Sequence, residues 1–363
     1  MEFKIFTDDF KIALEKVEKG IAKKSALPIL EAVKIEIKED HCYLISDDLE
    51  KRIETKRNTI SENMEGSFIL ENPKKILKAV KLFKEMETKF NITDKKITII
   101  SGNKQIEIIN KFNPKDFPEG RNIGEIKEQH NYNSKQLKER YNLIKYAASK
   151  DISRPILTGI CFRNNIMIAC DSYRLATNTD DNLTISSKNI VLPSENIKLI
   201  TDILEGSLTI NISNKYFIAE DENTKITSRI FEGEYPDINR IIPTNGEILT
   251  INSKEFIEEL KYFKDMTNKN DFKVAFKNGK LEVVTNEGKY KSEIETEGQT
   301  LDYYVVFDGN YMLEALKQFE GKIDIYFIGQ KAPIKIIQEN NLALVLPIYS
   351  KDAVYFADDT KAA

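Results

Sequence analysis

The sequence predicts an α+β fold of three repeated domains, in which two helices per domain pack on an antiparallel sheet. A loop signature occurs as FNPKDFP at 112–118 and again as FEGEYP at 231–236. The tripeptide Asn-Ser-Lys opens an amphipathic segment at 133–135 and another at 252–254. The members of each pair lie about 119 residues apart, and such a fixed period of self-similarity indicates a repeated structural unit.

Two helices are expected in each third of the chain. The first follows a polar cap, after which apolar residues recur every three or four positions. The candidate caps are Thr7 or Asp8, Ser134 and Ser253. The second helix follows an apolar run in the middle of each third, and its start signals are Asn72-Pro73, Pro193-Ser194 and Asp308.

Half-buried antiparallel strands are expected between the helices, because β-branched and polar residues alternate there with period two. The clearest segments are 33–37, 96–100, 105–109, 208–212 and 323–327, and Asn278-Gly279 is a hairpin turn signal. The repeat predicts domain 1 at 1–122, domain 2 at 128–244, domain 3 at 247–348, and a C-terminal extension at 349–363.

The composition is that of a water-soluble globular protein, with 41% hydrophobic and 31% charged residues. No apolar run reaches the length of a membrane span, and the first ten residues lack a signal peptide's apolar core. We therefore expect a cytoplasmic protein.

The residues that most often carry catalysis are scarce. Cys42, Cys161 and Cys170 form no CxxC pair, so we expect buried thiols and neither a zinc site nor a disulfide; both histidines are expected at the surface. A hydrolase or transferase built on Asp171 and Ser172 would lack a paired base. No P-loop, GxGxxG, HExxH or nucleophile elbow occurs, and we expect no enzyme activity, cofactor or metal.

Lysines recur along one face of the predicted helix after Asn72, although the net charge is −4. Lys74, Lys78 and Lys81 are spaced by four and three residues. Such a stripe is either a solvated helix face or a surface that contacts DNA phosphates without reading sequence. Glu195 and Asp202 dilute the charge of the corresponding helix in the second repeat.

Six segments together resemble the bacterial sliding clamp family, the beta subunits of DNA polymerase III. They occur in order along nearly the whole chain: LPIL at 27–30, SDDLE at 46–50, SRPILTGI at 153–160, CDSYRLA at 170–176, YPDINRIIP at 235–243 and LVLPI at 344–348. The resemblance implies a homodimeric ring that encircles double-stranded DNA, slides without sequence specificity and acts as a polymerase processivity factor. Its implied partners are the DNA polymerase III alpha subunit, the clamp loader and other proteins with a clamp-binding motif. The alternative is a peptide-binding scaffold that does not encircle DNA, and dimerisation discriminates between the two.

The resemblance also implies three sets of site residues. A peptide-binding pocket is expected at Arg154, Leu157, Cys170, Ser172, Tyr173, Leu175, Pro236, Arg240, Ile241, Leu344, Leu346 and Pro347. DNA contacts are expected at Lys24, Lys74, Lys78, Lys81 and Lys150, and a dimer interface at Ile106, Ile108 and Met266. Leu157, Leu175 and Ile241 would look the same in a plain core, whereas two arginines beside apolar positions favour a pocket.

The end of the chain departs from the family pattern. It continues beyond LVLPI as YSKDAVYFADDTKAA, a segment that we expect to be a disordered terminus. An apolar cluster at 354–356 could instead compete for the pocket, in which case truncation after Ile348 would tighten peptide binding.

Overall fold

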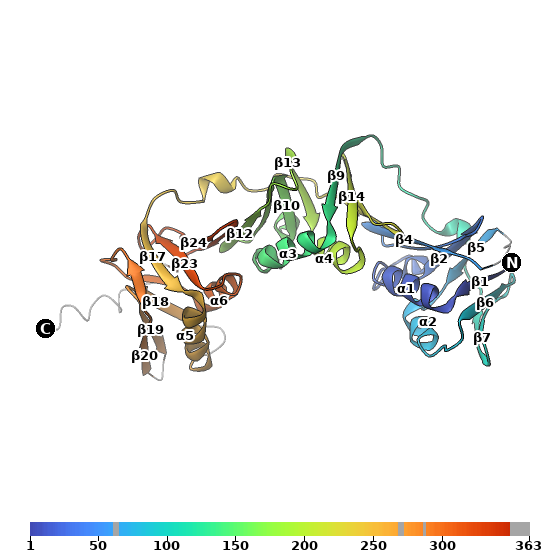
Figure 1. Ribbon diagram of the computed structural model, residues 1–363, viewed down its shortest axis with the longest axis horizontal. Helices are drawn as coiled ribbons and strands as arrows, with labels where there is room; N and C mark the ends of the chain where they lie inside the picture. The colour runs from blue at the N-terminus through green and yellow to red at the C-terminus, as the bar shows by residue number, and fades with distance from the viewer. Residues whose placement is uncertain (61–64, 268–271, 286–287, 349–363) are drawn as a thin grey trace. The chain divides into compact units, whose positions relative to one another are not determined.

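The computed structural model describes residues 1–60, 65–267, 272–285 and 288–348 (Figure 1). The predicted extension at 349–363 lies outside these residues. None of the helices in the described part of the chain is long and apolar enough to cross a membrane.

The described residues form six successive βαβββ units, each a strand, a helix and three further strands, so that each of the three predicted repeats consists of two such units. The first two units are β1 (Glu2–Phe6), α1 (Thr7–Glu18), β2 (Val33–Lys38), β3 (His41–Asp47) and β4 (Lys51–Asn58), then β5 (Gly66–Leu70), α2 (Pro73–Val80), β6 (Glu87–Ile92), β7 (Lys96–Ser101) and β8 (Lys104–Ile109). The next two are β9 (Ile126–Asn133), α3 (Ser134–Ile144), β10 (Gly159–Asn164), β11 (Ile166–Cys170) and β12 (Arg174–Thr179), then β13 (Ile185–Pro193), α4 (Ser194–Ile203), β14 (Ser207–Ser213), β15 (Tyr216–Glu220) and β16 (Thr224–Arg229). The last two are β17 (Glu247–Asn252), α5 (Ser253–Asp265), β18 (Lys273–Lys277), β19 (Lys280–Thr285) and β20 (Gly288–Glu293), then, after the short strand β21 (Thr296–Gly298), β22 (Val305–Asp308), α6 (Gly309–Leu316), β23 (Lys322–Phe327), β24 (Ile334–Gln338) and β25 (Asn341–Val345).

Neighbouring units exchange their first strands, which ties them together in pairs. β1 pairs with β6 and β5 with β2, and the same exchange joins β9 to β14, β13 to β10, β17 to β23 and β22 to β18. Each unit therefore yields a four-stranded antiparallel sheet completed by a strand of its partner. Two pairs of these sheets continue into each other, through β4 and β16 and through β12 and β25.

Backbone contacts group the chain into two compact units. The first compact unit comprises residues 1–138 and 195–230 and contains the β4–β16 joint. The second comprises residues 139–194 and the described residues from 231 on, and contains the β12–β25 joint.

The capping residues of α1, α3 and α5 differ from the prediction. Asn133 and Asn252, each one position before the predicted serine, accept backbone N–H groups with their side-chain Oδ1. Asp308 caps α6 as predicted. Thr7 is no cap either, because its hydroxyl hydrogen-bonds Thr88 Oγ1 at 2.8 Å and Phe6 occupies the cap position.

Aromatic side chains fill the core formed by the first two βαβββ units. Phe3 stacks on Phe90 with ring centroids 4.6 Å apart, and Phe10 meets the edge of the same ring at 4.9 Å. All three are almost completely buried. Phe90 on β6 therefore packs against its cross-strand partner on β1 and against α1, which lies on this sheet.

We expect Phe90→Ala to lower the free energy of unfolding by about 3–5 kcal/mol, because a large cavity would open where two other rings meet. Thermal or urea unfolding followed by circular dichroism measures the change. Phe6→Ala is the matched control, since that side chain is 43% exposed and its loss should have little effect. Equal losses in the two variants would contradict this account of the core.

Candidate functional site

The predicted peptide-binding residues lie on four segments of the second compact unit, the last of which is the loop after Phe231 that carries Pro236, Arg240 and Ile241. A short 3-10 helix, Pro155–Thr158, carries Leu157, the β11–β12 hairpin carries the CDSYRLA motif, and β25 carries Leu344. The hairpin turns at Asp171, whose Oδ1 accepts the backbone N–H groups of Tyr173 and Arg174. The carboxylate is thus used to shape the turn, which is the usual role of aspartate in this position.

Four apolar members of the predicted pocket belong to one buried cluster. Leu157, Cys170, Leu175 and Leu344 belong to it, and none is more than 8% exposed. Leu175 and Leu344 are direct cross-strand partners in the β12–β25 joint. The sheet joint itself therefore forms the apolar floor of the candidate site.

Polar and aromatic groups surround this floor. Arg154 is exposed and its Nη1 donates to Ser172 Oγ at 3.1 Å. Tyr173 is 57% exposed, and its carbonyl accepts the N–H of Leu346 at 2.9 Å. Pro347 bridges to the backbone of Phe307. Ser172 has an arginine as its hydrogen-bond partner, so it is not set up as a nucleophile.

The loop that follows Phe231 contributes residues that the prediction missed. Tyr235 and Ile238 are buried in the apolar cluster, and Pro236 between them is half-buried. The side chain of Arg240, by contrast, is 87% exposed and pairs with Asp237 of its own loop at 3.2 Å. Ile241 is 40% exposed. Roles for Arg240 and Ile241 in peptide binding stay predictions.

Arg174, also missed, connects this hairpin to α6. Its Nε donates to Asp171 at 3.2 Å, and its Nη1 donates to Glu314. The guanidinium lies 4.5 Å from the ring centroid of Tyr311, which stacks on Tyr173 at 5.7 Å. A signal was present in the sequence, because an arginine inside a strand-like run is rarely buried without partners.

The three cysteines are buried and unpaired with one another, as the sequence predicted. Burial raises the pKa of Cys161 to about 12 and raises the pKa of Cys170 as well. Burial, with the Cys170 thiol beside it, also raises the pKa of the Tyr235 hydroxyl. The floor of the candidate site therefore stays uncharged near neutral pH.

His41 and His130 are half-buried beside carboxylates rather than fully exposed.

The corresponding place in the first compact unit is ionic. Asp47 and Arg52 are the cross-strand partners just before and after the β3–β4 turn, where the β11–β12 hairpin has Cys170 and Leu175. Asp47 is fully buried and accepts hydrogen bonds from Arg121 at 2.6 and 2.9 Å and from Arg52 at 3.2 Å. The two hairpins share a backbone plan but differ in the chemistry of their surroundings.

The predicted DNA-contacting lysines are exposed, and some are paired. Lys74 on α2 and Lys81, which caps its end, lie 3.4 and 3.0 Å from Glu18 and Glu15 of α1. Lys24, Lys78 and Lys150 are also exposed. Surface ion pairs of this kind are weak and exchange readily with other anions.

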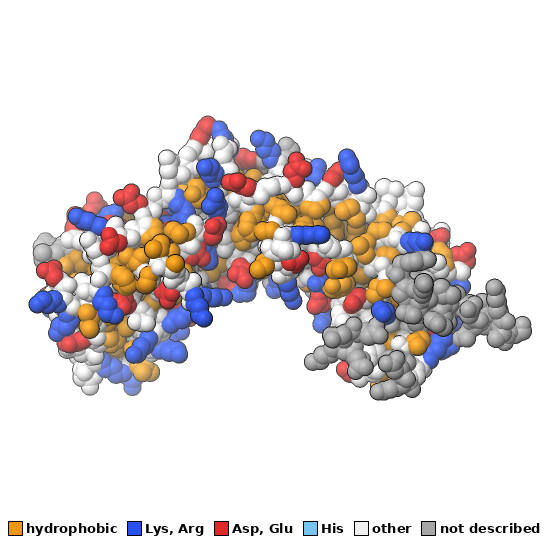
Figure 2. All heavy atoms as spheres, turned by 180° about the vertical axis from the view of Figure 1, so that it is seen from behind, with side chains coloured by type: hydrophobic (Ala, Val, Ile, Leu, Met, Phe, Trp, Pro, Cys, Tyr) orange, Lys and Arg blue, Asp and Glu red, His pale blue; other side chains and the backbone are white. Residues whose placement is uncertain are grey.

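Lys24 and Lys74 line one hollow of about 1140 Å³ in the first compact unit. The same hollow is lined by Lys51 and Lys198, which the prediction did not include, and by Glu195 and Asp202. Figure 2 shows that basic and acidic side chains are interspersed on the face it draws. The charge pattern thus permits phosphate contact without a strongly positive surface.

The predicted interface residues Ile106 and Ile108 lie on β8, at the edge of the sheet β1-β6-β7-β8. Met266 caps the end of α5 and is 41% exposed. The edge strand of the corresponding sheet in the second compact unit is β20, which the prediction did not name. Among the described residues, β8 and β20 are the last strands of their βαβββ units, and neither has a strand on its outer side.

Two family models match the chain in succession. The N-terminal domain of the DNA polymerase III beta subunit matches residues 1–121, and the central domain of the same subunit matches residues 131–237. Together they cover more than half of the chain.

Similar proteins and structures agree with these matches along nearly the full length. The beta sliding clamp of Streptococcus pneumoniae serotype 4 is 28% identical over 96% of this chain and 99% of its own length. That of Bacillus subtilis is 25% identical with the same coverage. The crystal structure of a putative DNA polymerase III beta subunit from Eubacterium rectale has a TM-score of 0.89 at 20% identity and covers 96% of this chain and 100% of that one. With the six βαβββ units and the two sheet joints, these matches show that the chain belongs to the family of bacterial DNA polymerase III beta subunits, the beta sliding clamps.

Proposed function

We propose that this protein is a non-catalytic DNA polymerase processivity factor, a homodimeric ring that encircles duplex DNA and tethers its partners through the site on the β12–β25 joint. One observation carries the proposal. In the described part of the chain, four-stranded sheets join edge to edge twice, and one further edge of the same kind is left in each compact unit. Unpaired strand edges favour pairing with another chain.

A second copy of the chain completes both remaining edges. β8 of each protomer pairs with β20 of the other, so the same head-to-tail contact is made twice and the assembly closes. This places Ile106 and Ile108 in the interface. Met266 follows α5, the helix of the βαβββ unit that contains β20, and belongs to the same end of the chain.

DNA contact is electrostatic and spread over Lys24, Lys74, Lys78, Lys81 and Lys150. A ring holds DNA by enclosing it, so it needs little affinity, and a net charge of −4 is compatible with this role. Contacts to phosphates carry no sequence information, which allows sliding.

The partners are proteins that carry a short linear motif with apolar residues, which bind the floor formed by Leu157, Leu175 and Leu344. Such a segment buries few side chains and must be ordered on binding, so micromolar affinity is expected for one peptide. The polymerase III alpha subunit and the clamp loader are the proposed main partners. Two sites per ring supply avidity.

The proposed domains are 1–122, 128–244 and 247–348, each made of two βαβββ units that exchange their first strands. The alternative of a scaffold that does not encircle DNA is not favoured, because it leaves the outer edges of β8 and β20 without partner strands.

The proposed function predicts a dimer that stays on circular DNA. Light scattering should give twice the mass of the 41.8 kDa chain. After loading, the protein should remain on nicked circular DNA and dissociate when the DNA is linearised. Ile106→Asp should give monomers that are never retained, because it puts a charge into the joint. A wild-type monomer, or equal retention on linear DNA, would refute the proposal.

We expect no single lysine to be essential for DNA contact. Lys24→Glu together with Lys150→Glu should slow loading and lower the salt dependence of binding, by about one unit of slope for each phosphate that is no longer neutralised. Circular dichroism should be unchanged, since both side chains are exposed. An effect that depends on DNA sequence would contradict an electrostatic contact.

Leu346→Ala and Tyr173→Ala are expected to weaken binding of a peptide with apolar C-terminal residues about tenfold, because they border the apolar floor. Fluorescence anisotropy with a labelled peptide measures this. Ile152→Ala is the control, because that side chain is 86% exposed and belongs to none of the site segments. If only the control variant loses affinity, the peptide binds elsewhere.

A further inference from the structure

We infer that two copies of this chain join in one particular register, in which Ile106 of β8 faces Tyr290 of β20 and Glu107 faces Lys289. The inference rests on the proposed ring and adds to it the residue pairs that select a second copy of this chain as the partner. It comes from the two sheet joints that the chain makes within itself.

Both internal joints obey the same counting rule. Each joining strand follows a tight hairpin whose first and fourth residues face each other: 48 and 51, 221 and 224, 171 and 174, and 338 and 341. Five residues after the first residue of each hairpin, that is, after 48 and 221, come Ile53 and Ile226, which are partners in the β4–β16 joint. The same count gives Ala176 and Ala343, which are partners in the β12–β25 joint.

The two free edges follow hairpins of the same kind. Ser101 faces Lys104 at the start of β8, and Thr285 faces Gly288 at the start of β20. Five residues after Ser101 and Thr285 come Ile106 and Tyr290, which the rule makes the central pair. Antiparallel pairing around this centre sets Glu107 opposite Lys289 and Gln105 opposite Lys291.

The sidedness of the two sheets agrees with this register. The central residues of the internal joints all face the core and are at most 2% exposed. Ile106 is the partner of fully buried Ile99 on β7, and Tyr290 is the partner of fully buried Val283 on β19. Tyr290 also packs against the core of its own domain. The register therefore brings two core-facing side chains together, while Glu107 and Lys289 share the opposite face.

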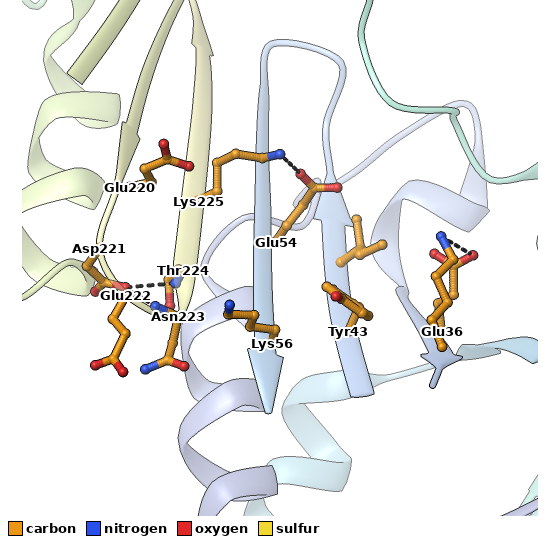
Figure 3. A pocket seen from close by; sticks show the side chains of 12 residues that line it. Glu36, Tyr43, Glu54, Lys56, Glu220, Asp221, Glu222, Asn223, Thr224 and Lys225 are labelled. Carbon is orange, nitrogen blue, oxygen red and sulfur yellow. Dashed lines mark hydrogen bonds and ion pairs between the residues drawn. The ribbon is translucent and has the colours of Figure 1, made fainter. Parts of the chain in front are cut away.

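The charge pair has a template inside the molecule. In the β4–β16 joint the same two positions are occupied by Glu54 and Lys225, whose Oε2 and Nζ lie 3.0 Å apart (Figure 3). Burial raises the pKa of Glu54, but Arg52 and Lys225 outweigh it and hold the pKa below its usual range. A carboxylate followed by a lysine across the joint is thus an arrangement that this fold already uses.

The neighbours of the two charges extend the pattern. Glu107 accepts a hydrogen bond from Lys96 of β7 at 2.8 Å, and Lys289 lies 2.9 Å from Glu282 of β19. Joining the edges gives a row of alternating charges across four strands, which runs through Lys96 on β7, Glu107 on β8, Lys289 on β20 and Glu282 on β19. Opposite charges on directly facing residues stabilise a sheet, and like charges destabilise it.

Charge reversal tests the pair. Glu107→Lys and Lys289→Glu should each raise the dimer dissociation constant about tenfold or more at low salt, because attraction becomes repulsion at both joints of the ring. The double variant should return to within about threefold of wild type, as expected for directly interacting residues. Sedimentation over a range of concentrations measures these constants.

Lys291→Glu is the matched control, since Lys291 lies on the same strand and also contacts Glu282, at 3.4 Å. It should have a smaller effect than Lys289→Glu, and Glu107→Lys should not rescue it. If Glu107→Lys rescued Lys291→Glu and not Lys289→Glu, the true register would differ from the inferred one by two residues.

Cysteine pairs test the register independently of affinity. Gln105→Cys combined with Lys291→Cys should form a disulfide between protomers under mild oxidation, because directly facing residues have the required Cβ separation. Gln105→Cys with Glu293→Cys should not, and the native cysteines are buried. A dimer that cross-links only through the second pair, or through neither, overturns this inference but leaves the ring intact. A chain that is monomeric without any substitution defeats the proposed function itself.

Discussion

Hydrogen bonding between the edges of four-stranded sheets is the constraint on which the rest of this structure depends. Every βαβββ unit ends in a strand whose outer backbone groups need partners. Two pairs of these strands meet within the chain, at β4–β16 and β12–β25. The last two, β8 and β20, can be satisfied in the same way by a second copy. Assembly then continues the folding of the single chain, and the same geometry that builds the monomer sets the contact between monomers.

The joints share a backbone and differ in side chains, which gives each one a distinct role. At β12–β25 the facing residues include Leu175 and Leu344, and an apolar floor results. At β4–β16 they include Glu54 and Lys225, and the buried Asp47 beside this joint is held by two arginines. An apolar peptide gains from the first surface and would have to displace satisfied charges at the second. The β12–β25 joint is therefore the better candidate for the proposed peptide site.

A clamp must hold DNA without stopping on it, and the charge distribution suits that requirement. The lysines of α2 are exposed, yet Glu15 and Glu18 of α1 neutralise part of their charge. This charge distribution suits the proposed weak, exchangeable contacts with phosphates, while closure of the proposed ring would provide retention. In the proposed ring, how long the protein stays on DNA is thereby separated from its affinity for DNA. Retention depends on the strand edges that close the ring.

The sequence by itself determined the α+β class, the repeat, most helix starts and the family, because periodicity, turn residues and short motifs are local properties. It also singled out Leu157, Cys170, Leu175 and Leu344, which the structure gathers into one cluster. The three repeats, each with two helices, were also expected; that each repeat is two βαβββ units that exchange their first strands emerges only from the strand pairing. Arg174, Tyr235 and the edge strand β20 were missed, because their importance comes from partners that are distant in the chain, such as Glu314 on α6. Only the tertiary structure decides which strand edges meet, because backbone hydrogen bonds between strands do not require particular residue types at particular sequence separations.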